Sequence, residues 1–497
     1  MSQNTTYFVG VDNGGTLSKA AVFDAQGREI AVASRRVNTL TPRAGWSERD
    51  METLWQDTAA AIRDAVQQSG VAPEQIRAIA CTGHGNGLYP LGKNGKIIRN
   101  AINSNDSRAQ SHIDRWLKNK IDEKVLPLTA QSLWAAQPAP LLAWLRDNEP
   151  DVFRDIETVL MAKDYIRYRL TGELRAEITD MSGTGLMNVV NRCYDNAVLE
   201  AYGIPEIARR LPPLVESTAI AGTITPAAAN LTGLPAAIPV AGGMFDIDAC
   251  ALSSGILDSR QFSIVAGTWG NNQYIAREPL IDRDLFMTSC YAIPGWFLML
   301  EGSPTSAGNL EWFLETFFAK ERTDWGTQFY TRISQMVANV PPDASQIIFL
   351  PFLNGCNCGK LKGGFFNLDA THGQAALLRA VFEGVAFAHY QHIERLLKFR
   401  DFPDVIRLTG GAARDPVWCQ LFADCIGAPV EVPAGSELGA LGAAIVATVA
   451  TGLHADVKEA VNAMTAIEKR YEPNPAATVI YRTKYAAYQT LIKKLKS

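Results

Sequence analysis

The chain begins with two short apolar segments separated by a stretch of small and polar residues. Residues 7–11 and 20–23 are mostly apolar, and residues 12–18 between them contain two adjacent glycines. Apolar runs that flank a glycine-containing stretch are typical of two paired strands joined by a tight turn. A second segment with the same pattern, residues 262–270, lies near the middle of the chain. The repetition predicts two domains that start in a similar way.

Alternating helices and strands follow in both halves of the chain. Residues 52–68 place apolar side chains every three or four positions, which predicts a helix with one buried face. A longer amphipathic pattern covers residues 374–399. Strands are predicted at residues 76–81, 237–241, 347–350 and 405–408, and a further helix at residues 141–148. This alternation indicates the α/β fold class.

The length of the chain indicates two domains. A chain of 497 residues exceeds what one hydrophobic core usually supports. No low-complexity tract or long linker interrupts it, and we expect the boundary near residues 248–258. This boundary divides the chain into an N-terminal domain, residues 1–250, and a C-terminal domain, residues 251–497.

Composition excludes several classes of function. Apolar residues make up 47% and charged residues 20%, which is ordinary for a globular enzyme. The net charge of −4 argues against general nucleic-acid binding, because there is no basic excess to neutralise phosphates. The first residues lack the pattern of a signal peptide, and no apolar run reaches membrane-spanning length. The eight cysteines are scattered, so we expect a cytoplasmic protein with reduced thiols and no membrane partner.

The glycine turns carry the first chemical signal. Gly14 and Gly15 have no Cβ, so their backbone N–H groups can approach an anion closely, and the Thr16 hydroxyl can add a further donor. Asp12, at the end of the preceding strand, could hold a magnesium ion against that anion. A lone turn of this composition is usually only a turn. Its repetition at Gly267 and Thr268 favours a phosphate site, and the arrangement resembles a nucleotide-dependent phosphotransferase of the actin-like superfamily.

A series of segments in a fixed order strengthens this interpretation. They are residues 45–50, 163–165, 170–172, 179–182, 242–246, 267–268, 301–302, 307–312, 410–415 and 437–444. In this order they resemble the motifs of the FGGY carbohydrate kinase family, over essentially the whole chain. The resemblance implies two actin-like (ribonuclease H-like) domains with a nucleotide and sugar cleft between them. It also implies that the first domain binds sugar and the second binds nucleotide.

The resemblance assigns roles to matched positions, with ATP and Mg²⁺ as cofactors. Phosphoryl transfer depends on positioning and charge neutralisation, which glycine turns and a carboxylate can supply. Asp12 is the expected metal ligand. Asp415 is less certain, because the family often has asparagine or serine there. The positions implied to contact nucleotide are Gly14, Gly15, Thr16, Gly267, Thr268, Gly308, Gly410, Gly411 and Asp415.

Asp246 is the expected catalytic base. A sugar hydroxyl loses its proton as it attacks phosphorus, and a nearby carboxylate can accept that proton. One alternative is that Asp246 only caps the helix predicted to follow it. Another is that Asp248, two residues further on, is the base. The family spacing to Gly255 favours Asp246.

The sugar pocket is expected at the loop of residues 83–87 and the segment of residues 103–108. Their polar groups can pair with sugar hydroxyls, and Trp269 could close the pocket with an apolar face. Ordinary core packing is an equally reasonable role for Trp269, and Arg108 could instead neutralise Asp106 in a structural pair. The candidate sugar contacts are His84, Asn86, Asn105, Asp106 and Trp269.

The substrate is harder to infer than the reaction. Residues 303–313 and 267–269 resemble the L-xylulose and 3-keto-L-gulonate kinase branch of the family. That branch usually has Gln-Gly-Lys-Gly in the substrate loop, whereas this chain has His84-Gly85-Asn86-Gly87 and a polar Asn103. We therefore expect ATP-dependent phosphorylation of a terminal hydroxyl of a small sugar, such as a ketopentose, by a possible homodimer. The alternatives are a kinase for a tetritol or glycerol and a non-catalytic sensor.

Overall fold

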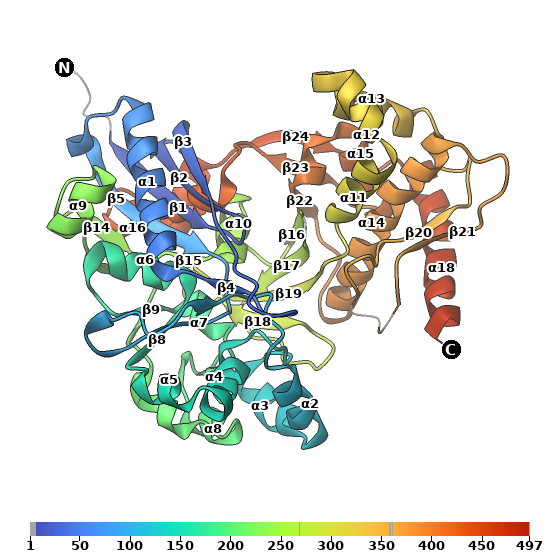
Figure 1. Ribbon diagram of the computed structural model, residues 1–497. Helices are drawn as coiled ribbons and strands as arrows, with labels where there is room; N and C mark the ends of the chain where they lie inside the picture. Colours follow the sequence, from blue (N-terminus) through green and yellow to red (C-terminus); the bar gives the residue numbers. More distant parts are fainter. Residues whose placement is uncertain (1–5, 268, 357–358, 360, 497) are drawn as a thin grey trace. The chain divides into compact units, whose positions relative to one another are not determined.

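The protein consists of two compact units, coloured by sequence in Figure 1. The computed structural model describes residues 6–267, 269–356, 359 and 361–496. The first unit contains Met1–Gly255, Ala276–Met299 and Gly435–Ala466, and the second contains Ile256–Ile275, Leu300–Ala434 and Ile467–Ser497. The units are therefore not continuous halves of the chain. A division at residue 250 leaves out two segments that pack with the first unit.

The main sheet of the first unit has the strand order β13-β14-β5-β1-β2-β3, and β15 also pairs with β5. Its strands are β1 (Tyr7–Asn13), β2 (Leu17–Asp24), β3 (Glu29–Arg36), β5 (Ile76–Gly83), β13 (Ile220–Thr223), β14 (Pro239–Ala241) and β15 (Met244–Phe245). Strands β1, β2 and β3 form an antiparallel meander, whereas β5 and β14 run parallel to β1. The predicted opening hairpin is present, and the Gly14 N–H closes its turn by donating to the Leu17 carbonyl.

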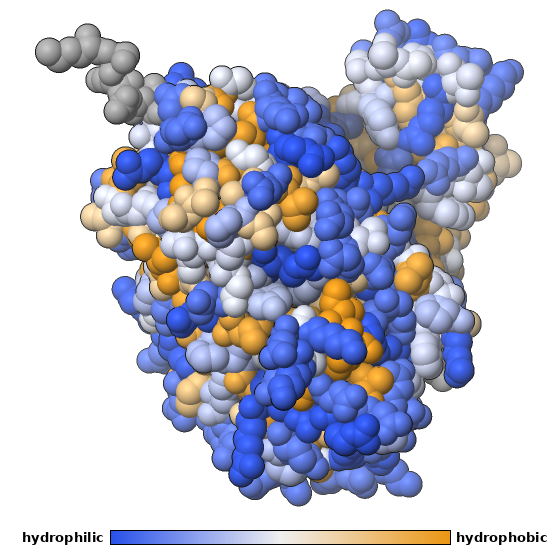
Figure 2. Space-filling model, turned by 60° about the vertical axis from the view of Figure 1, so that its left-hand side comes forward, coloured by the Kyte–Doolittle hydropathy of each residue, from blue (hydrophilic) through white to orange (hydrophobic). Residues whose placement is uncertain are grey.

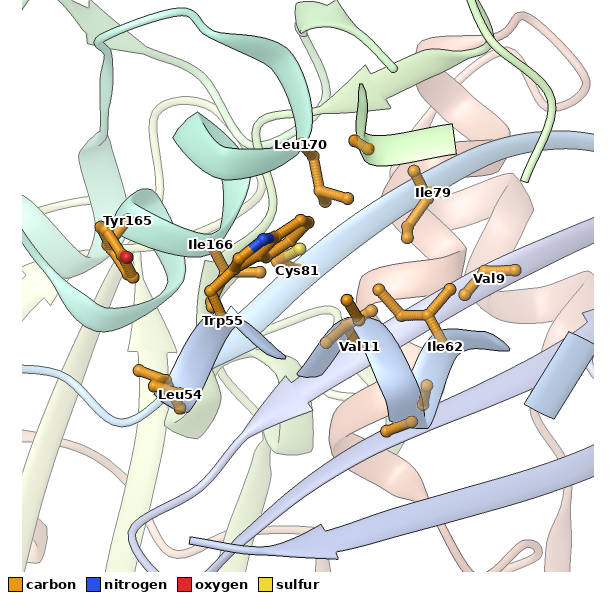
Figure 3. Close-up of a cluster of buried hydrophobic side chains, with 14 of the residues drawn as sticks. Val9, Val11, Leu54, Trp55, Ile62, Ile79, Cys81, Tyr165, Ile166 and Leu170 are labelled. Carbon is orange, nitrogen blue, oxygen red and sulfur yellow. The ribbon is translucent and has the colours of Figure 1, made fainter. Parts of the chain in front are cut away.

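Helices cover both faces of this sheet. They are α1 (Met51–Ser69), α6 (Ala162–Thr171), α9 (Pro226–Thr232), α10 (Asp246–Ser253), α16 (Leu438–Ala450) and α17 (Val457–Met464). On one face, Val9 and Val11 of β1 pack with Trp55 and Ile62 of α1 in a buried apolar cluster, shown in Figure 3. Period-2 alternation turns Gly10 to the other face, where α16 lies. A Cβ at Gly10 would stand 1.8 Å from the Ala440 carbonyl oxygen, so only glycine permits this close approach.

The rest of the first unit is built from short helices and two-stranded ladders. The helices are α2 (Gln110–Lys118), α3 (Ile121–Thr129), α4 (Pro138–Asn148), α5 (Pro150–Asp155), α7 (Ile178–Ser182) and α8 (Asn196–Ala201). The strands of these ladders are β4 (Glu48–Arg49), β6 (Tyr89–Leu91), β7 (Ala101–Ile102), β8 (Thr158–Leu160), β9 (Ala176–Glu177), β10 (Met187–Asn188), β11 (Cys193–Tyr194) and β12 (Leu214–Val215). Strand β18 (Met287–Cys290) is instead an edge strand of a seven-stranded sheet, next to β19 (Phe297–Ser303). These elements carry the loops that follow β5.

The second unit has a sheet in which neighbouring strands run in the order β19-β17-β16-β22-β23-β24. Its strands are β16 (Gln261–Ala266), β17 (Gly270–Ala276), β19 (Phe297–Ser303), β20 (Ile348–Leu350), β21 (Gly364–Phe366), β22 (Val405–Gly410), β23 (Val430–Pro433) and β24 (Ile467–Tyr471). Its helices are α11 (Gly308–Phe317), α12 (Ala319–Trp325), α13 (Phe329–Ala338), α14 (Gln374–Leu396), α15 (Pro416–Ile426) and α18 (Pro475–Lys496). The predicted long helix is α14, which passes into a 3₁₀ turn at Leu397–Phe399.

The two sheets have similar strand arrangements. In each, the first two strands form an antiparallel hairpin, and a parallel strand lies beside the first. The second strand has a further neighbour in each sheet, β3 beside β2 and β19 beside β17. In each, one further parallel strand and an antiparallel edge strand complete the sheet. The similarity predicted from the two hairpin patterns therefore extends to six strand positions, and β15 in the first sheet and β18 in the second are additional.

One face of the molecule is shown as a space-filling view in Figure 2. The face shown in Figure 2 is mostly hydrophilic, with apolar side chains in small groups. Within the described part of the chain, no helix combines the length and apolar character needed to cross a membrane. The apolar residues are instead concentrated in buried clusters such as that of Figure 3.

Candidate active site

Three strand ends meet at one edge of the first sheet. Asp12 of β1 and Met244 of β15 both pair with Thr82 of β5, one on each side. The backbone N–H of His84, just after β5, donates to the Asn13 carbonyl at 3.0 Å. Asp246 follows β15 directly. The sheet register therefore brings Asp12, His84 and Asp246, which are distant in sequence, to the same edge.

Asp246 is the first residue of α10, and the N-cap position belongs to Phe245. Asp246 is therefore not the helix cap that one sequence interpretation allowed. Removal from water raises the pKa of its carboxyl group well above the usual range, and the nearby carboxylates of Asp12 and Asp180 raise it further. The backbone N–H of Ile247 acts in the opposite direction. A carboxylate with a raised pKa is a stronger proton acceptor, which suits a general base.

Asp248 has a different environment. Its side chain is completely buried, and neither oxygen has a hydrogen-bond partner of ordinary geometry among the described residues. Burial raises its pKa well above the usual range, and Glu177, Asp180 and Asp246 add to the shift. Its complete burial denies a substrate access to the carboxyl group, whereas the Asp246 side chain is partly exposed. Of the two candidate bases, the geometry favours Asp246.

Asp12 has the features of a ligand for a hard cation. Burial raises its pKa to about 6, the positive charge of Lys19 opposes that shift, and Glu437 adds to it. Its Oδ1 atom is buried without a hydrogen-bond partner among the described residues. No group of three or more metal-binding side chains occurs in the described ranges. Mg²⁺ commonly takes one or two carboxylates and completes its shell with phosphate and water oxygens, so the residues present fit this ion.

The glycine turn of residues 14–16 is held by hydrogen bonds from side chains that sequence reasoning missed. Gly15 and Thr16 are exposed, and Gly14 is partly exposed. The Nη2 group of the buried Arg49 donates to the Gly15 carbonyl at 2.9 Å. The Asn13 side-chain amide donates to hydroxyl oxygens of α1 and β2 at 2.9 Å. The turn therefore presents its N–H groups from a rigid base, which is what anion binding requires.

His84 is buried and neutral. Its Nε2 atom lies 3.3 Å from Nη1 of Arg49 and 3.1 Å from the Tyr89 hydroxyl. A guanidinium can only donate, so Nε2 accepts and Nδ1 carries the proton, facing the Gly85 carbonyl at 3.4 Å. Burial and the charge of Arg49 lower the pKa of His84 to about 3. Both ring nitrogens therefore have protein partners, and the neutral ring adds no charge to the loop.

Two buried amides near this loop have free acceptors. Asn86 adopts a left-handed backbone conformation with φ of 61°, and its Oδ1 atom has no partner among the described residues. Asn103 donates to the Ser47 hydroxyl at 3.0 Å, while its Oδ1 atom is also unpartnered there. An unmet buried acceptor costs about 1–3 kcal/mol. A sugar hydroxyl that donated to either oxygen would recover part of that cost.

Asp106 is occupied by the protein itself. Its Oδ1 atom accepts from the backbone and Nε of Arg108, and its Oδ2 atom accepts from the Ser47 N–H and Nη2 of Arg108. Four bonds use the acceptor capacity of a carboxylate. The structure therefore supports the structural alternative for Asp106, in which Arg108 neutralises it. Asn105, the neighbouring candidate, is exposed.

The nucleotide candidates of the second unit also gather at a sheet edge. Gly410 at the end of β22 pairs with Ala266 at the end of β16, next to Gly267. A Cβ at Gly410 would lie 2.6 Å from the Ala266 carbonyl oxygen, and its φ of 86° also requires glycine. A Cβ at Gly411 would lie 4.0 Å from Ala307, immediately before Gly308 and α11. Thr268 lies outside the described residues, and the adjacent Trp269 is 47% exposed.

Asp415 caps the N-terminus of α15. Its Oδ1 atom accepts from the backbone N–H groups of Val417 at 2.8 Å and Trp418 at 3.1 Å, and from the Ser334 hydroxyl at 2.9 Å. Burial raises its pKa, and these three donors oppose the shift. The side chain therefore has a clear structural role at the position where the family often has asparagine or serine, both of which also cap helices.

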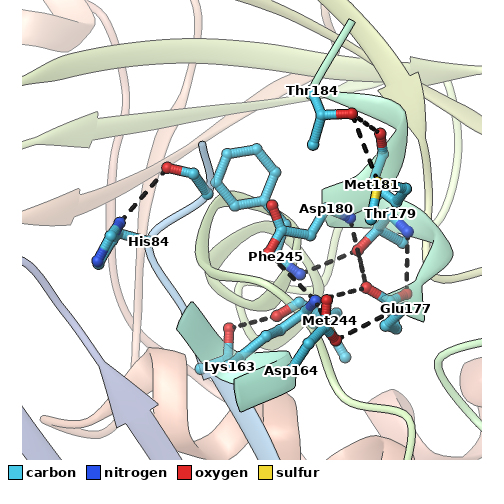
Figure 4. Close-up of polar contacts among 12 residues, drawn as sticks. His84, Lys163, Asp164, Glu177, Thr179, Asp180, Met181, Thr184, Met244 and Phe245 are labelled. Atoms are coloured by element: carbon cyan, nitrogen blue, oxygen red, sulfur yellow. Dashed lines mark hydrogen bonds and ion pairs between the residues drawn. The ribbon is translucent and has the colours of Figure 1, made fainter. Parts of the chain in front are cut away.

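A buried cluster of charges supports the site of the first unit (Figure 4). The Lys163 ammonium group lies 3.1 Å from Asp164, 3.4 Å from Glu177 and 3.1 Å from Asp180. Burial lowers the pKa of Lys163, but the three carboxylates outweigh this effect and raise it overall. Burial raises the pKa of Asp180 to about 7, against the effect of Lys163. The sequence motifs include Lys163, Asp164 and Asp180 but not Glu177, and their spacing alone does not reveal that these side chains meet.

The fold and the site together define a class of protein. Two α/β units with similar strand orders, each with a glycine turn after the first strand of its sheet, form the architecture of the actin-like ATPase fold. A solved structure of xylulose kinase from Rhodospirillum rubrum matches with a TM-score of 0.89 at 26% identity, covering 99% of each chain. Acidic side chains at the edge of one sheet and glycine turns in both units are typical of nucleotide-dependent phosphotransferases.

Comparison with known sequences identifies the family. The family models for the FGGY family of carbohydrate kinases match the chain, the N-terminal domain at residues 7–253 and the C-terminal domain at residues 262–451. The chain is 40% identical over 497 residues to the L-xylulose/3-keto-L-gulonate kinase of Escherichia coli (strain K12), covering 99% of this chain and 98% of that protein. It is 38% identical over 496 residues to the probable L-xylulose kinase of Pasteurella multocida (strain Pm70), covering 99% of both.

The chain therefore belongs to the FGGY family of carbohydrate kinases. It is an enzyme that phosphorylates a small sugar with ATP as the phosphoryl donor, as the motifs of its sequence predict.

Proposed function

We propose that this enzyme phosphorylates L-xylulose, or the related keto-sugar acid 3-keto-L-gulonate, at a terminal primary hydroxyl. The observation that carries the proposal is the level of identity. It is 38–40% over the whole chain to proteins named for these sugars and 26% to the xylulose kinase of known structure. The substrate loop departs from the pattern of that branch at His84 and Asn86, so these positions are where preference among related sugars would change.

The first unit supplies the sugar site and the base. The free amide oxygen of Asn86 suits a sugar hydroxyl that donates to it, and the neutral His84 in the same loop adds no charge there. The raised pKa of Asp246 suits proton removal from the attacking hydroxyl. As the sugar oxygen bonds to the γ-phosphorus of ATP, the bond from that phosphorus to the bridging oxygen breaks. The hydroxyl proton passes to Asp246, and ADP leaves.

The glycine turns supply the nucleotide contacts. Gly14, Gly15 and Thr16 would meet phosphate oxygens from the first unit, and Gly267 with Thr268 from the second. Gly410 and Gly411 lie at the sheet edge where an adenosine could approach backbone. Asp12 would hold Mg²⁺, which when bound neutralises phosphate charge during transfer. Asp415 would act mainly through the helix that it caps.

A substrate panel tests the proposal. ADP release is measured in a coupled assay with ATP and Mg²⁺ against L-xylulose, 3-keto-L-gulonate, D-xylulose, L-ribulose, erythritol and glycerol, and without sugar. We expect the highest kcat/KM with one of the first two. A clear preference for glycerol or erythritol would instead show a polyol kinase. Binding of nucleotide without phosphorylation of any sugar would indicate a sensor.

Location and assembly form a further part of the proposal. The enzyme needs ATP and makes a charged sugar phosphate, which supports a cytoplasmic protein, as do its scattered cysteines. We include a homodimer as the proposed assembly. Cell fractionation and light scattering on the purified protein test these two points, and a protein that stays monomeric at high concentration would exclude the dimer.

A further inference from the structure

The backbone immediately before Asp246 is held by two threonine hydroxyls. Strand β15 contains only Met244 and Phe245 and pairs with the end of β5. The Phe245 N–H donates to Oγ1 of Thr179 at 2.9 Å, and Oγ1 of Thr82 donates to the Met244 carbonyl at 2.8 Å. Both threonines are completely buried. A two-residue strand makes few ladder hydrogen bonds, so these side chains are a large part of what fixes it.

The hydroxyl of Thr179 can bond Phe245 in only one way. It donates to Oε2 of Glu177 at 2.8 Å, and a hydroxyl has a single proton to donate. Its lone pairs are therefore left for the Phe245 N–H. The carboxylate of Glu177 is itself fixed, because Oε1 accepts from the Thr179 N–H at 3.0 Å and from the Ser217 hydroxyl at 2.7 Å. Lys163 lies 3.4 Å from Oε2 and supplies positive charge.

These contacts form a continuous relay from Lys163 through Glu177 and Thr179 to the backbone of Phe245, and Figure 4 shows its members converging there. Each member is completely or almost completely buried, so water does not compete for the bonds. Asp246 follows Phe245 directly and opens α10. A shift of the Phe245 peptide would therefore move the Asp246 carboxylate with it.

We propose that Thr179 is a positioning residue for the reaction, through which the Lys163–Glu177 pair sets the place of the Asp246 carboxylate. The inference rests on the proposed role of Asp246 as the base. Thr179 touches no substrate in this scheme. It acts by holding the peptide that carries the base. A displacement of about 1 Å at a reacting group can cost about 10²-fold in rate, so loss of this bond should appear in kcat.

The test removes the hydroxyl group of Thr179 and nearly preserves the shape of the side chain. Thr179→Val is nearly isosteric but cannot accept from the Phe245 N–H, and Thr179→Ser restores the hydroxyl. Thr184→Val is the matched control, because Thr184 lies in the same segment and its hydroxyl donates to the Met181 carbonyl at 2.6 Å and not to the backbone of β15. Each full-length variant is assayed with the best sugar of the panel for kcat, for KM of both substrates and for nucleotide affinity.

We expect Thr179→Val to lower kcat by about 10- to 100-fold while both KM values stay within about threefold. Thr179→Ser should recover most of the rate, and Thr184→Val should resemble the unmodified enzyme. The inference is wrong if Thr179→Val keeps its kcat, if Thr179→Ser is as slow as Thr179→Val, or if Thr184→Val is equally slow. If Thr179→Val does not fold, Thr82→Val tests the same peptide from its other side, with the same expected loss of kcat.

Asp246→Asn separates this inference from the proposed function. If Asp246→Asn keeps normal turnover, the assignment of the base fails. If Asp246→Asn is inactive while Thr179→Val is fully active, the base stands and only the positioning role fails.

Discussion

His389 should make the second unit sensitive to acid. It lies on α14, where its Nδ1–H donates to Oδ1 of Asn272 at 2.8 Å and its Nε2 accepts from the Ser306 hydroxyl at 2.8 Å. His392, on the same helix face, bonds the Ser303 hydroxyl and Glu301 in a similar way. Both histidines are buried and hydrogen-bonded.

The size of the effect follows from the pKa of His389. Burial, with a smaller contribution from the positive charge of His392, lowers that pKa from 6.5 to about 3. Between these two values the unfolded chain binds a proton that the folded unit does not bind. Stability therefore rises with pH through this window and is lost as the pH falls below 6.5. At pH 5 the pKa of this histidine in the unfolded chain lies 1.5 units above the solution pH. At 1.36 kcal/mol per unit, His389 alone then lowers the free energy of unfolding by about 2 kcal/mol.

Amide hydrogen exchange of α14 measures this loss of stability in the second unit, where His389 lies. The opening free energy of the helix is compared at pH 7.5 and pH 5.0, after correction for the intrinsic exchange rate, in the unmodified protein and in His389→Gln. Glutamine retains hydrogen bonding but does not titrate. The neighbouring Glu301, His392 and Arg395 are the same in both proteins, so their contributions cancel. We expect the loss on acidification to be smaller in His389→Gln by about 2 kcal/mol.

An equal loss in both proteins would refute the argument. It would mean that the folded unit accommodates a charged His389, for example by reorienting the Ser306 hydroxyl. His389→Asn also lacks a titrating group but has a shorter side chain, so it checks whether the result is specific to glutamine. Both variants should then show the same reduced dependence on pH.

Three further changes test the site and its support. Asp246→Asn should lower kcat by about 10²–10⁴-fold and leave nucleotide binding nearly intact, measured by coupled ADP release and by nucleotide titration; near-normal turnover would contradict the assignment of the base. Lys163→Met should lower the free energy of chemical unfolding by about 3–5 kcal/mol, because three buried carboxylates lose their shared cation. Arg154→Met, which removes an exposed ion pair, should leave the unfolding transition unchanged. Gly10→Ala should destabilise the first unit by about 1–3 kcal/mol, because its Cβ would overlap the Ala440 carbonyl; a thermal melt like that of the unmodified protein would show that α16 can move away freely.

The local pattern of apolar and polar residues was sufficient to predict the helices and strands whose formation depends mainly on residues close in sequence. The hairpin of β1 and β2, the helices α1 and α14 and the strands β5 and β22 all lie where periodicity and glycine turns predict them, within a few residues. Period 2 and period 3.6 depend only on which side of a strand or helix is buried. The order of the motifs was also sufficient for the family, because it is a property of the chain and needs no coordinates.

The sequence did not indicate which polar groups are already used by the protein. Asp106 lies in a family motif, yet Arg108 and Ser47 occupy both of its oxygens. Asp415 is bound to the helix that follows it. Arg49, which holds the Gly15 carbonyl and faces His84, gave no signal beyond its place in a motif. Hydrogen-bond partners of this kind come from distant segments, so linear spacing cannot reveal them.

The sequence by itself therefore determined the fold class and the kinase family, and it supplied the candidate positions for the chemistry. The tertiary structure decided which of these side chains have hydrogen-bonding atoms without a protein partner and in which direction their pKa values shift. Sheet register brings Asp12, His84 and Asp246 together, and the segment Gly435–Ala466 returns to cover Gly10 from the far end of the chain. Burial and charge then set the pKa values of the two aspartates and the histidine. Both depend on distances in space, and a linear pattern contains no such distances.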